Sequence, residues 1–354
     1  MTSTRRAAAL LLAGAAALGG ATALALAGVE PFPTWHYVFA WAAVLAMADA
    51  AVALLEGRFY LLGRPAFLAT LLAWSFPFWF LFELFNFRLE NWYYVYVPAD
   101  RASRWAGTAL AYATVLPAVL VAERLLRAAG VARRTGIARL TVTPGLLWAL
   151  QATGVAMLAL SMTWPRAFFP LVWGGVAMLA DPFVHRRAPE RSLLGDRERG
   201  HAGRALRVHL GGLAIGLVWE SLNAAALTRW IYTVPGFEDV KVFEMPVLGF
   251  LGFPVFALEA FTAWQALVVS GLAVPREGEA RPAPWGARAA AGAGALAFST
   301  LVLIGMERDT FSSTRPRLGD LPGLPSAAAV ALREDGMDAF ELARAEPGDV
   351  AAVA

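Results

Sequence analysis

Long apolar runs, separated by short polar segments, recur along most of the chain. An α-helix needs about 20 apolar residues to cross roughly 30 Å of hydrocarbon. The pattern predicts an all-α fold, a polytopic transmembrane helix bundle of about nine spans with a small helical tail. The first run is expected to be a signal anchor, although a signal peptide has a similar pattern. The nine runs lie near residues 8–28, 36–56, 66–87, 106–127, 143–163, 165–184, 207–228, 246–273 and 289–306.

Arginine and lysine are concentrated in alternate segments between the predicted spans. One set of segments carries 19 positive residues, the other set carries 6, and the tail carries the remaining 5. Because positive residues are retained on the cytoplasmic side, this bias places the N-terminus in the cytoplasm, at a bacterial inner membrane. Nine spans then place the C-terminal tail outside. The topology also explains the isoelectric point of about 9.5, so a nucleic-acid partner is not expected.

The composition limits the possible chemistry. Only 16% of the 354 residues are charged and the mean hydropathy is +0.54, whereas soluble domains carry about 25% charged residues. The chain has no cysteine, which excludes disulfides, thiolate metal sites and cysteine nucleophiles. It has four scattered histidines without a zinc spacing, no glycine-rich nucleotide loop and no nucleophile elbow. Neither a metal nor a cofactor is predicted.

Residues that are rare in membrane helices recur in the same order in two halves of the chain. The offset between matched positions drifts only from 129 to 138 residues. We predict a membrane domain at 1–306 with two parallel four-helix repeats, at about 8–130 and 140–273, and an extra span at 289–306. The matches are Thr34-Trp35 with Thr163-Trp164, Trp41 and Asp49 with Trp173 and Asp181, Glu83-x-x-Asn86 with Glu220-x-x-Asn223, Trp92-x-Tyr94 with Trp230-x-Tyr232, and Pro117 and Glu123 with Pro254 and Glu259.

Six acidic residues fall inside the predicted spans, and no lysine or arginine is expected deep enough in the membrane to neutralise them. One charge at the bilayer centre costs about 2.5–3.5 kcal/mol on insertion scales. We therefore expect some of these groups to be neutral, to share a proton or to line a wet cavity. They form two layers at different depths, and the six are Asp49, Glu83, Glu123, Asp181, Glu220 and Glu259.

The two Glu-x-x-Asn motifs are the strongest candidates for a functional site, because residues three apart face the same side of a helix. Glu220 and Asn223, with Glu83 and Asn86 as counterparts, are the candidate catalytic residues. A structural role is equally open, in which these groups hydrogen-bond between helices and the Trp-x-Tyr rings anchor the chain at the membrane interface. The candidate substrate-binding residues are Trp219, Trp230, Tyr232, Trp92, Tyr94, Glu259 and Phe253.

Proline and glycine are crowded at the start of the eighth predicted span, at Pro246, Gly249, Gly252 and Pro254. A straight helix is not expected there. A break frees backbone carbonyls, which a membrane tolerates only beside a cavity or other protein. The nearby phenylalanines then either line a hydrophobic cavity or pack in the core.

A resemblance appears in the second half of the chain. Trp219-Glu220-x-x-Asn223, Trp230-x-Tyr232 and Gly252-Phe253-Pro254 are similar to motifs of an uncharacterised family of bacterial integral membrane proteins, which implies no established activity. The first two motifs also resemble the small membrane lycopene cyclases, whose Pro-x-Glu-Glu is replaced here by Pro254 and a single Glu259. The second likeness implies a lipid or isoprenoid substrate, a buried protonated glutamate as the acid, and aromatic faces that stabilise a carbocation.

The composition changes after Met306. Residues 307–320 are predicted to be a linker, and residues 321–354 resemble a helix-hairpin-helix module whose first helix runs to Arg333 and whose second starts at Ala339. Pro325 takes the second glycine position of the usual hairpin and has no N–H to offer a phosphate. A protein partner or a capping role is therefore favoured over nucleic acid.

Three functions remain open at this point. An enzyme or binding protein for a lipid or isoprenoid predicts an apolar cavity at the Glu-x-x-Asn motifs. A transporter or channel for protons or cations predicts a polar path that joins the two layers of acids. A scaffold predicts that the acids only hold the helices together. The density of aromatic residues and the lack of basic residues near the motifs favour the first.

Overall fold

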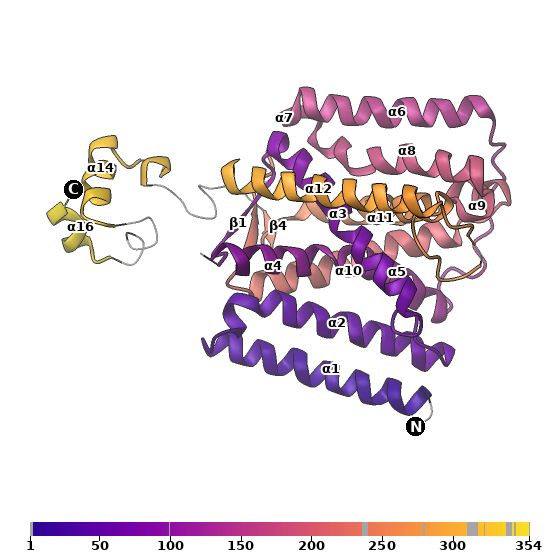
Figure 1. Cartoon of the computed structure of the whole chain (residues 1–354), viewed down its shortest axis with the longest axis horizontal. Coiled ribbons are helices and arrows are strands. Elements are labelled where there is room, and N and C mark those ends of the chain that lie inside the picture. The colour runs from indigo at the N-terminus through magenta and orange to yellow at the C-terminus, as the bar shows by residue number, and fades with distance from the viewer. Residues whose placement is uncertain are drawn as a thin grey trace.

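Long helices lie side by side in a bundle, and short connecting segments gather at its two ends (Figure 1). This computed structural model describes residues 3–98, 100–235, 240–278, 280–309, 318–321, 323–337, 342 and 345–353. We call the end that holds β1 (Trp92–Val95) the strand end. The opposite end, which holds Arg58, Arg127 and Arg276, is called the arginine end.

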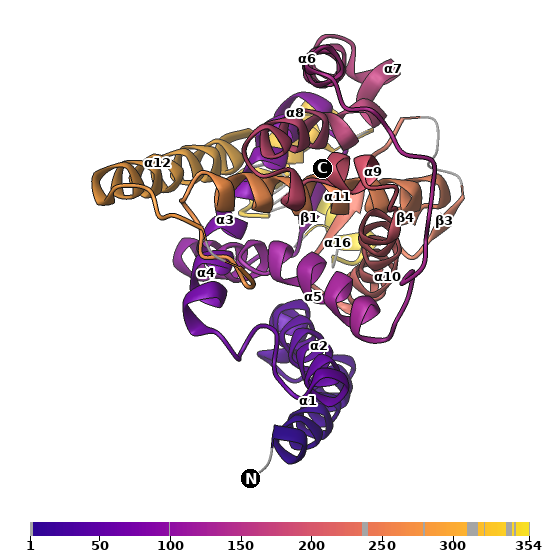
Figure 2. The ribbon, with the colours of Figure 1, turned by 90° about the vertical axis from the view of Figure 1, so that its right-hand side faces the viewer.

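Four helices, α3, α5, α10 and α11, form the centre of the bundle, and α2 and α8 pack beside them. α1 and α6 lie at opposite edges (Figure 1), and α12 covers a third side, where it packs on α3 (Figure 2). The helices are α1 (Ser3–Leu26), α2 (Phe32–Glu56), α3 (Pro65–Leu89), α4 (Arg101–Tyr112), α5 (Val115–Ala128), α6 (Pro144–Thr163), α7 (Pro165–Phe168), α8 (Val172–Arg187), α9 (Leu193–Glu198), α10 (Gly203–Ala225), α11 (Gly252–Val269) and α12 (Trp285–Asp309).

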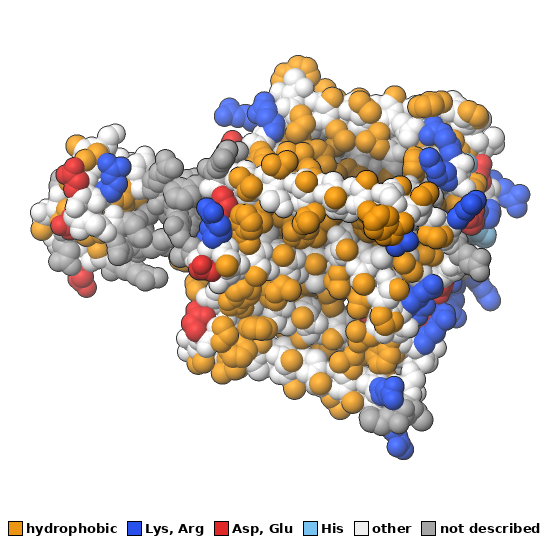
Figure 3. All heavy atoms as spheres, in the orientation of Figure 1, with side chains coloured by type: hydrophobic (Ala, Val, Ile, Leu, Met, Phe, Trp, Pro, Cys, Tyr) orange, Lys and Arg blue, Asp and Glu red, His pale blue; other side chains and the backbone are white. Residues whose placement is uncertain are grey.

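Eight segments of the described chain are long and apolar enough to cross a membrane, and they correspond to eight of the nine predicted spans. The ninth, α10, has a similar length and packs between α5 and α11. It is less apolar because it carries His209, Glu220 and Asn223. Hydrophobic side chains cover the flank of the bundle, and arginines gather mainly at one end (Figure 3). The chain is therefore a multi-pass membrane protein with an all-α transmembrane bundle.

Three spans are interrupted at their strand-end halves, one of them at Trp173 and Gly174 of α8. A 3-10 segment, η3 (Val247–Leu251), leads into α11, so the break predicted from proline and glycine is confirmed. α4 and α5 are separated by a short turn whose backbone is satisfied by Ser75 of α3. Ser75 Oγ donates to the carbonyl of Tyr112 (2.6 Å) and accepts from the N–H of Leu116 (3.0 Å). Such a partner is required because water is not present to bond the freed groups.

Two short antiparallel sheets lie at the strand end, and the sequence analysis does not predict them. β1 pairs with β2 in a register that places Trp92 opposite Tyr232 and Tyr94 opposite Trp230. The two Trp-x-Tyr motifs, which the structural alternative treats as interface anchors, thus form strands that pair with each other. The remaining short elements are β2 (Arg229–Tyr232), β3 (Lys241–Val242), β4 (Met245–Pro246), η1 (Phe169–Leu171) and η2 (Pro189–Arg191).

The described part of the tail has a small core of its own, built around Leu318, Ala329 and Leu332. Its elements are η4 (Leu318–Asp320), α14 (Ser326–Glu334) and α16 (Pro347–Val353). α12 continues to Asp309, so the first residues of the predicted 307–320 linker belong to that helix. The predicted start of the second tail helix at Ala339 lies outside the described residues.

Candidate functional site

A cavity of about 460 Å³ lies at the strand end, between the two halves of the chain. Leu251 of η3 is part of its wall and is 68% exposed, so the cavity reaches the outer surface of the bundle beside η3. Pockets of this size that are mainly apolar, with a few polar groups, are typical of small-molecule sites. The aromatic lining residues are Trp35, Tyr37, Trp79, Trp92, Tyr94, Tyr112, Phe169, Trp173, Trp219, Trp230, Tyr232, Phe253 and Phe256.

Glu83 of α3 lies behind this aromatic wall and is 2% exposed. Its Oε1 accepts hydrogen bonds from the Tyr112 hydroxyl (2.8 Å), the Trp79 indole (2.9 Å) and the Trp92 indole (3.3 Å). The Tyr94 hydroxyl donates to the same oxygen. These donors come from three elements: α3, β1 and the end of α4. Four donors on one carboxylate oxygen hold the acid in place.

Glu220 occupies the corresponding place on α10 and is fully buried. The Tyr232 hydroxyl donates to its Oε1 (2.9 Å), and the Trp230 indole donates to the Tyr232 hydroxyl (2.9 Å). Glu220 Oε2 is buried without a hydrogen-bond partner among the described residues. A buried unpaired oxygen is unfavourable by about 1–3 kcal/mol.

The two asparagines hold the strands against their helices. Asn223 Nδ2 donates to the carbonyl of Trp230 (2.9 Å), and its Oδ1 accepts from the N–H of the same residue (3.0 Å). Asn86 Nδ2 donates to the carbonyl of Trp92 (2.8 Å), and its Oδ1 accepts from the N–H of Asn91 (2.9 Å). Both amides are thus occupied by backbone groups. They position the Trp-x-Tyr strands beside the carboxyl groups.

The strand tyrosines are hydrogen-bond donors at neutral pH. Burial raises the pKa of Tyr94 and of Tyr232, and the carboxylates of Glu83 and Glu220 raise these pKa values further. Each phenol therefore stays protonated and donates to its glutamate. Because both tyrosines also line the cavity, each is placed between a buried acid and any molecule held there.

Trp219 joins the two halves of the aromatic wall. Its ring centroid lies 5.4 Å from that of Trp79 and 5.9 Å from that of Trp230, which it meets edge-on. On the other side, Trp173 stacks on Phe82 at 5.4 Å. The faces of such rings carry partial negative charge, so they stabilise a cation within about 6 Å.

No protein-family model, curated protein or solved structure matches the chain. The part of the chain that the structure describes holds no group of three or more His, Asp or Glu side chains able to bind a metal ion. The function therefore has to be argued from the cavity and its residues.

Six of the seven predicted binding residues line the cavity, and Glu259 does not. Glu259 Oε1 accepts from the N–H of Val176 (2.9 Å), close to the point where α8 is broken at Trp173 and Gly174. Gly174 has a φ of +106°, which favours glycine at this position. Glu259 therefore supports the broken helix. The six residues in the wall are Trp219, Trp230, Tyr232, Trp92, Tyr94 and Phe253.

Several residues that line the cavity are not predicted from the sequence. The position of Trp79 could have been predicted from the sequence. It precedes Glu83 by four residues, so both side chains lie on the same face of the helix. Arg104 and Glu307 form a two-point ion pair in the cavity wall, with Nε–Oε1 at 2.6 Å and Nη2–Oε2 at 2.7 Å. This ion pair fixes α12 to α4. Nothing in the local sequence links the two residues, which lie 203 positions apart.

Two of the other acids hydrogen-bond to the backbone of the segments that connect helices. Asp49 accepts hydrogen bonds of 2.6–2.9 Å from the backbone N–H groups of residues 60–62. Asp181 accepts in the same way from residues 193 and 194, at 2.8 and 2.9 Å. Both carboxylates are therefore used to fix the backbone that follows their helix.

Glu123 of α5 is paired with Arg207 of α10, with Nε–Oε1 at 2.7 Å. The expectation that no basic side chain reaches the acids is thus wrong for Glu123, because Arg207 extends from the first turns of α10 to α5. Between this layer and the cavity the core is mainly apolar, with Ser75, Glu259 and Thr262 as buried polar side chains. Its fully or almost fully buried side chains include Phe67, Leu71, Phe82, Leu116, Val119 and Ala260.

Proposed function

We propose that the cavity binds a hydrophobic small molecule of the lipid or isoprenoid class and presents it to the glutamate–tyrosine pairs. One observation carries the proposal. In the wall of a single aromatic cavity, the hydroxyls of Tyr94 and Tyr232 hydrogen-bond to the buried Glu83 and Glu220. An apolar ligand gains roughly 25 cal/mol for each Å² of apolar surface that it buries there. The exposed Leu251 in the wall supports entry from the bilayer.

The chemistry that suits this arrangement is proton-initiated isomerisation or cyclisation of a carbon–carbon double bond. Tyr232 gives its proton to the alkene and regains one from Glu220, and the resulting carbocation lies against Trp219 and Trp230. The cation then loses a proton, through Tyr94, to Glu83. One proton enters and one leaves, so the step needs no oxidant or reductant. The likeness to small membrane lycopene cyclases supports the same class of substrate.

The proposed setting is a bacterial inner membrane with the N-terminus in the cytoplasm, which the uneven distribution of arginine supports. Transport of protons or cations is the less favoured alternative. It requires a polar path between the two layers of acids, and buried apolar residues such as Leu71 and Leu116 occupy much of that region. A purely structural role leaves the cavity without a purpose.

The experiment compares the lipids and isoprenoids of cells that carry the wild-type chain, a deletion, or the deletion complemented with a variant. Glu220→Gln keeps the shape of the side chain but cannot donate or accept the proton, and Tyr232→Phe removes only the hydroxyl. We expect one apolar species to be lost in the deletion and not restored by either variant. Chromatography with mass detection identifies that species.

Ser221→Ala is the matched control, because Ser221 follows Glu220 on α10 and its hydroxyl only bonds the carbonyl of Val218 (2.8 Å). This variant should restore the wild-type profile. Extraction of the purified protein should release the same apolar species or its precursor. Identical profiles in every strain, together with an extract that contains only bulk phospholipid, contradict the proposal.

A further inference from the structure

The arginine end holds a second hollow, far from the aromatic cavity and outside the proposed function. It measures about 440 Å³ and is lined by Glu56 and four arginines, Arg124, Arg127, Arg133 and Arg207. We propose that this hollow, which we call the arginine pocket, binds the phosphate of an anionic phospholipid headgroup. Its surplus of positive charge, its available N–H groups and its position in the bundle all suit such a headgroup.

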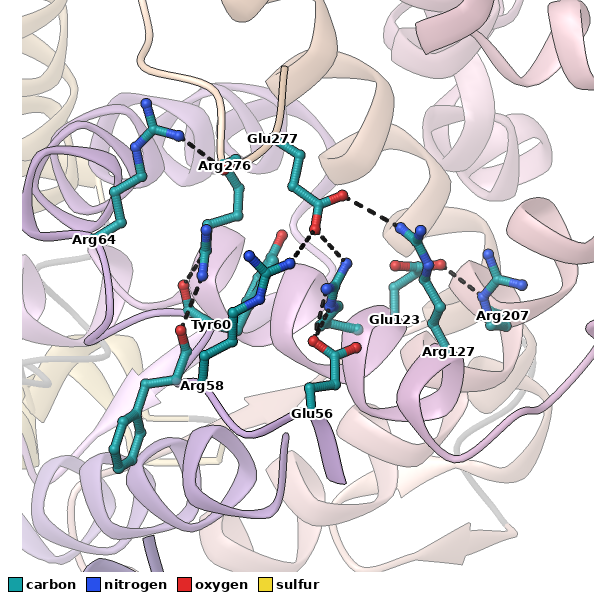
Figure 4. Close-up of polar contacts among 11 residues, drawn as sticks. Glu56, Arg58, Tyr60, Arg64, Glu123, Arg127, Arg207, Arg276 and Glu277 are labelled. Carbon is teal, nitrogen blue, oxygen red and sulfur yellow. Dashed lines mark hydrogen bonds and ion pairs between the residues drawn. The ribbon is translucent and has the colours of Figure 1, made fainter. Parts of the chain in front are cut away.

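Positive charge exceeds negative charge around the arginine pocket. Ion pairs connect the lining residues to neighbouring residues. Several of these ion pairs are drawn as dashed lines in Figure 4. Arg64 and Arg276 add further positive charge, and both donate to backbone carbonyls rather than to carboxylates. The surplus attracts an anion to this end of the bundle. The charged residues are Arg58, Arg64, Arg124, Arg127, Arg133, Arg207 and Arg276 against Glu56, Glu123 and Glu277.

Three of the lining arginines keep N–H groups available. Arg207 uses Nε for Glu123, and Arg127 makes one long ion pair through Nη1, at 3.6 Å from Glu277 Oε2. Among the described residues no carboxylate lies at ion-pair distance from Arg133. A guanidinium has five N–H donors in a planar fork that fits two phosphate oxygens at once. Arg124 differs, because it is held by Glu56 (2.6 Å) and Glu277 (2.8 Å).

Two glycines bring the walls of the arginine pocket together. Gly130 ends α5 with a φ of +83°, and a Cβ there would lie 3.0 Å from Arg133 Nε. At Gly203 a Cβ would lie 2.4 Å from the carbonyl oxygen of Ala132. The turn after α5 therefore packs directly on the start of α10. This packing places Arg133 and Arg207, which belong to different segments, in the wall of one hollow.

The position of the pocket favours a lipid over a soluble phosphate. α2 and α5 end beside it and α10 begins there, so it lies where apolar helices reach the level of the headgroups. Leu55 lines the pocket and is 55% exposed, which offers apolar surface to an acyl chain. Basic pockets between membrane helices on the cytoplasmic side are known to bind anionic headgroups. A zwitterionic lipid is disfavoured, because its cationic group would meet the surplus of arginine.

The test measures binding of short-chain phosphatidylglycerol to the full chain in neutral maltoside micelles by native mass spectrometry. Phosphatidylcholine of the same chain length and inorganic phosphate are the other ligands. We expect phosphatidylglycerol to bind, and Arg127→Gln with Arg133→Gln to weaken it about fivefold for each arginine removed. Raising the salt concentration should weaken binding to the wild type as well.

Arg134→Gln is the matched control, because Arg134 is an exposed neighbour of Arg133 that does not line the pocket. It should bind phosphatidylglycerol as the wild type does. The inference is overturned if phosphatidylcholine binds equally well, or if Arg134→Gln weakens binding as much as the double variant. Inorganic phosphate that competes at equal concentration would make the pocket a site for free phosphate instead. A melting temperature unchanged by the substitutions shows that each variant is folded.

Discussion

Acidic side chains of the same type serve different purposes in this protein, according to the donors around them. Asp49 accepts hydrogen bonds from three backbone N–H groups, and Glu123 forms an ion pair with an arginine. Glu83 accepts hydrogen bonds from four side-chain donors. Each set of contacts replaces the water that the carboxylate loses on burial. Glu220 is different, because it combines an unpaired buried oxygen with a partner, Tyr232, that lines the cavity. That combination makes Glu220 the best candidate for a proton donor.

The structural role of Asp49 can be tested by Asp49→Asn. The substitution replaces one carboxylate oxygen by an NH₂ group, which faces a backbone N–H and cannot accept its hydrogen bond. We expect the protein to lose about 1–3 kcal/mol of stability, seen as a lower melting temperature in detergent. The binding of a ligand at the strand end should not change. Asp335→Asn, at an exposed position of the tail, is the control, and equal melting temperatures for both variants would contradict the assigned role.

At the scale of elements, the pairing of β1 with β2 closes the cavity and joins the two halves. Tyr93 and Ile231 are directly opposite each other in the register and do not line the cavity. Opposite residues of antiparallel strands have Cα atoms roughly 4.5–5.5 Å apart, which suits a disulfide. Because the chain has no native cysteine, Tyr93→Cys with Ile231→Cys should form one cross-link under mild oxidation.

The cross-link is detected by a shift in electrophoretic mobility that a reducing agent reverses. Tyr93→Cys with Val240→Cys is the matched control, since Val240 lies outside β2 and is 68% exposed. Cross-linking of the control pair as fast as the strand pair would mean that the strands do not hold this register.

The sequence predicts the spans much better than it predicts the site. The length of the apolar runs is enough to locate the spans. The three-residue spacing of Glu83 and Asn86 predicts that they share one helix face, and both are buried there. The sheet could not be found, because four-residue strands more than 130 positions apart are determined by tertiary packing rather than by local pattern. The role of Arg104 could not be predicted for the same reason, since its partner Glu307 belongs to α12.

At the scale of the whole molecule, the two ends of the bundle differ in chemistry, and an apolar core separates them. The strand end holds the aromatic cavity, and the arginine end holds ion pairs and the arginine pocket. Residues matched by the predicted duplication make matching contacts at each end: Asn86 and Asn223 bind a strand, and Asp49 and Asp181 bind the following backbone. These are the matching contacts that a duplicated unit predicts.

The orientation of the molecule follows from these two ends. Arginine-rich segments are retained in the cytoplasm, so the strand end should face outward. Arg104 binds Glu307 at the strand end, which means that the tail leaves the bundle there and that α10 must cross the membrane as well. We therefore expect Val240→Cys and Val330→Cys to react with an impermeant maleimide in intact cells.

Arg134→Cys should react only after the membrane is permeabilised, because Arg134 is exposed at the arginine end. The cysteine-free parent chain gives the background. Labelling is read by the mass added to the purified protein. If Val330→Cys behaves like Arg134→Cys while Val240→Cys is labelled from outside, the tail lies in the cytoplasm and the number of spans is even. If Arg134→Cys is the variant labelled in intact cells, the whole bundle is inverted, and the arginine pocket faces the outer leaflet.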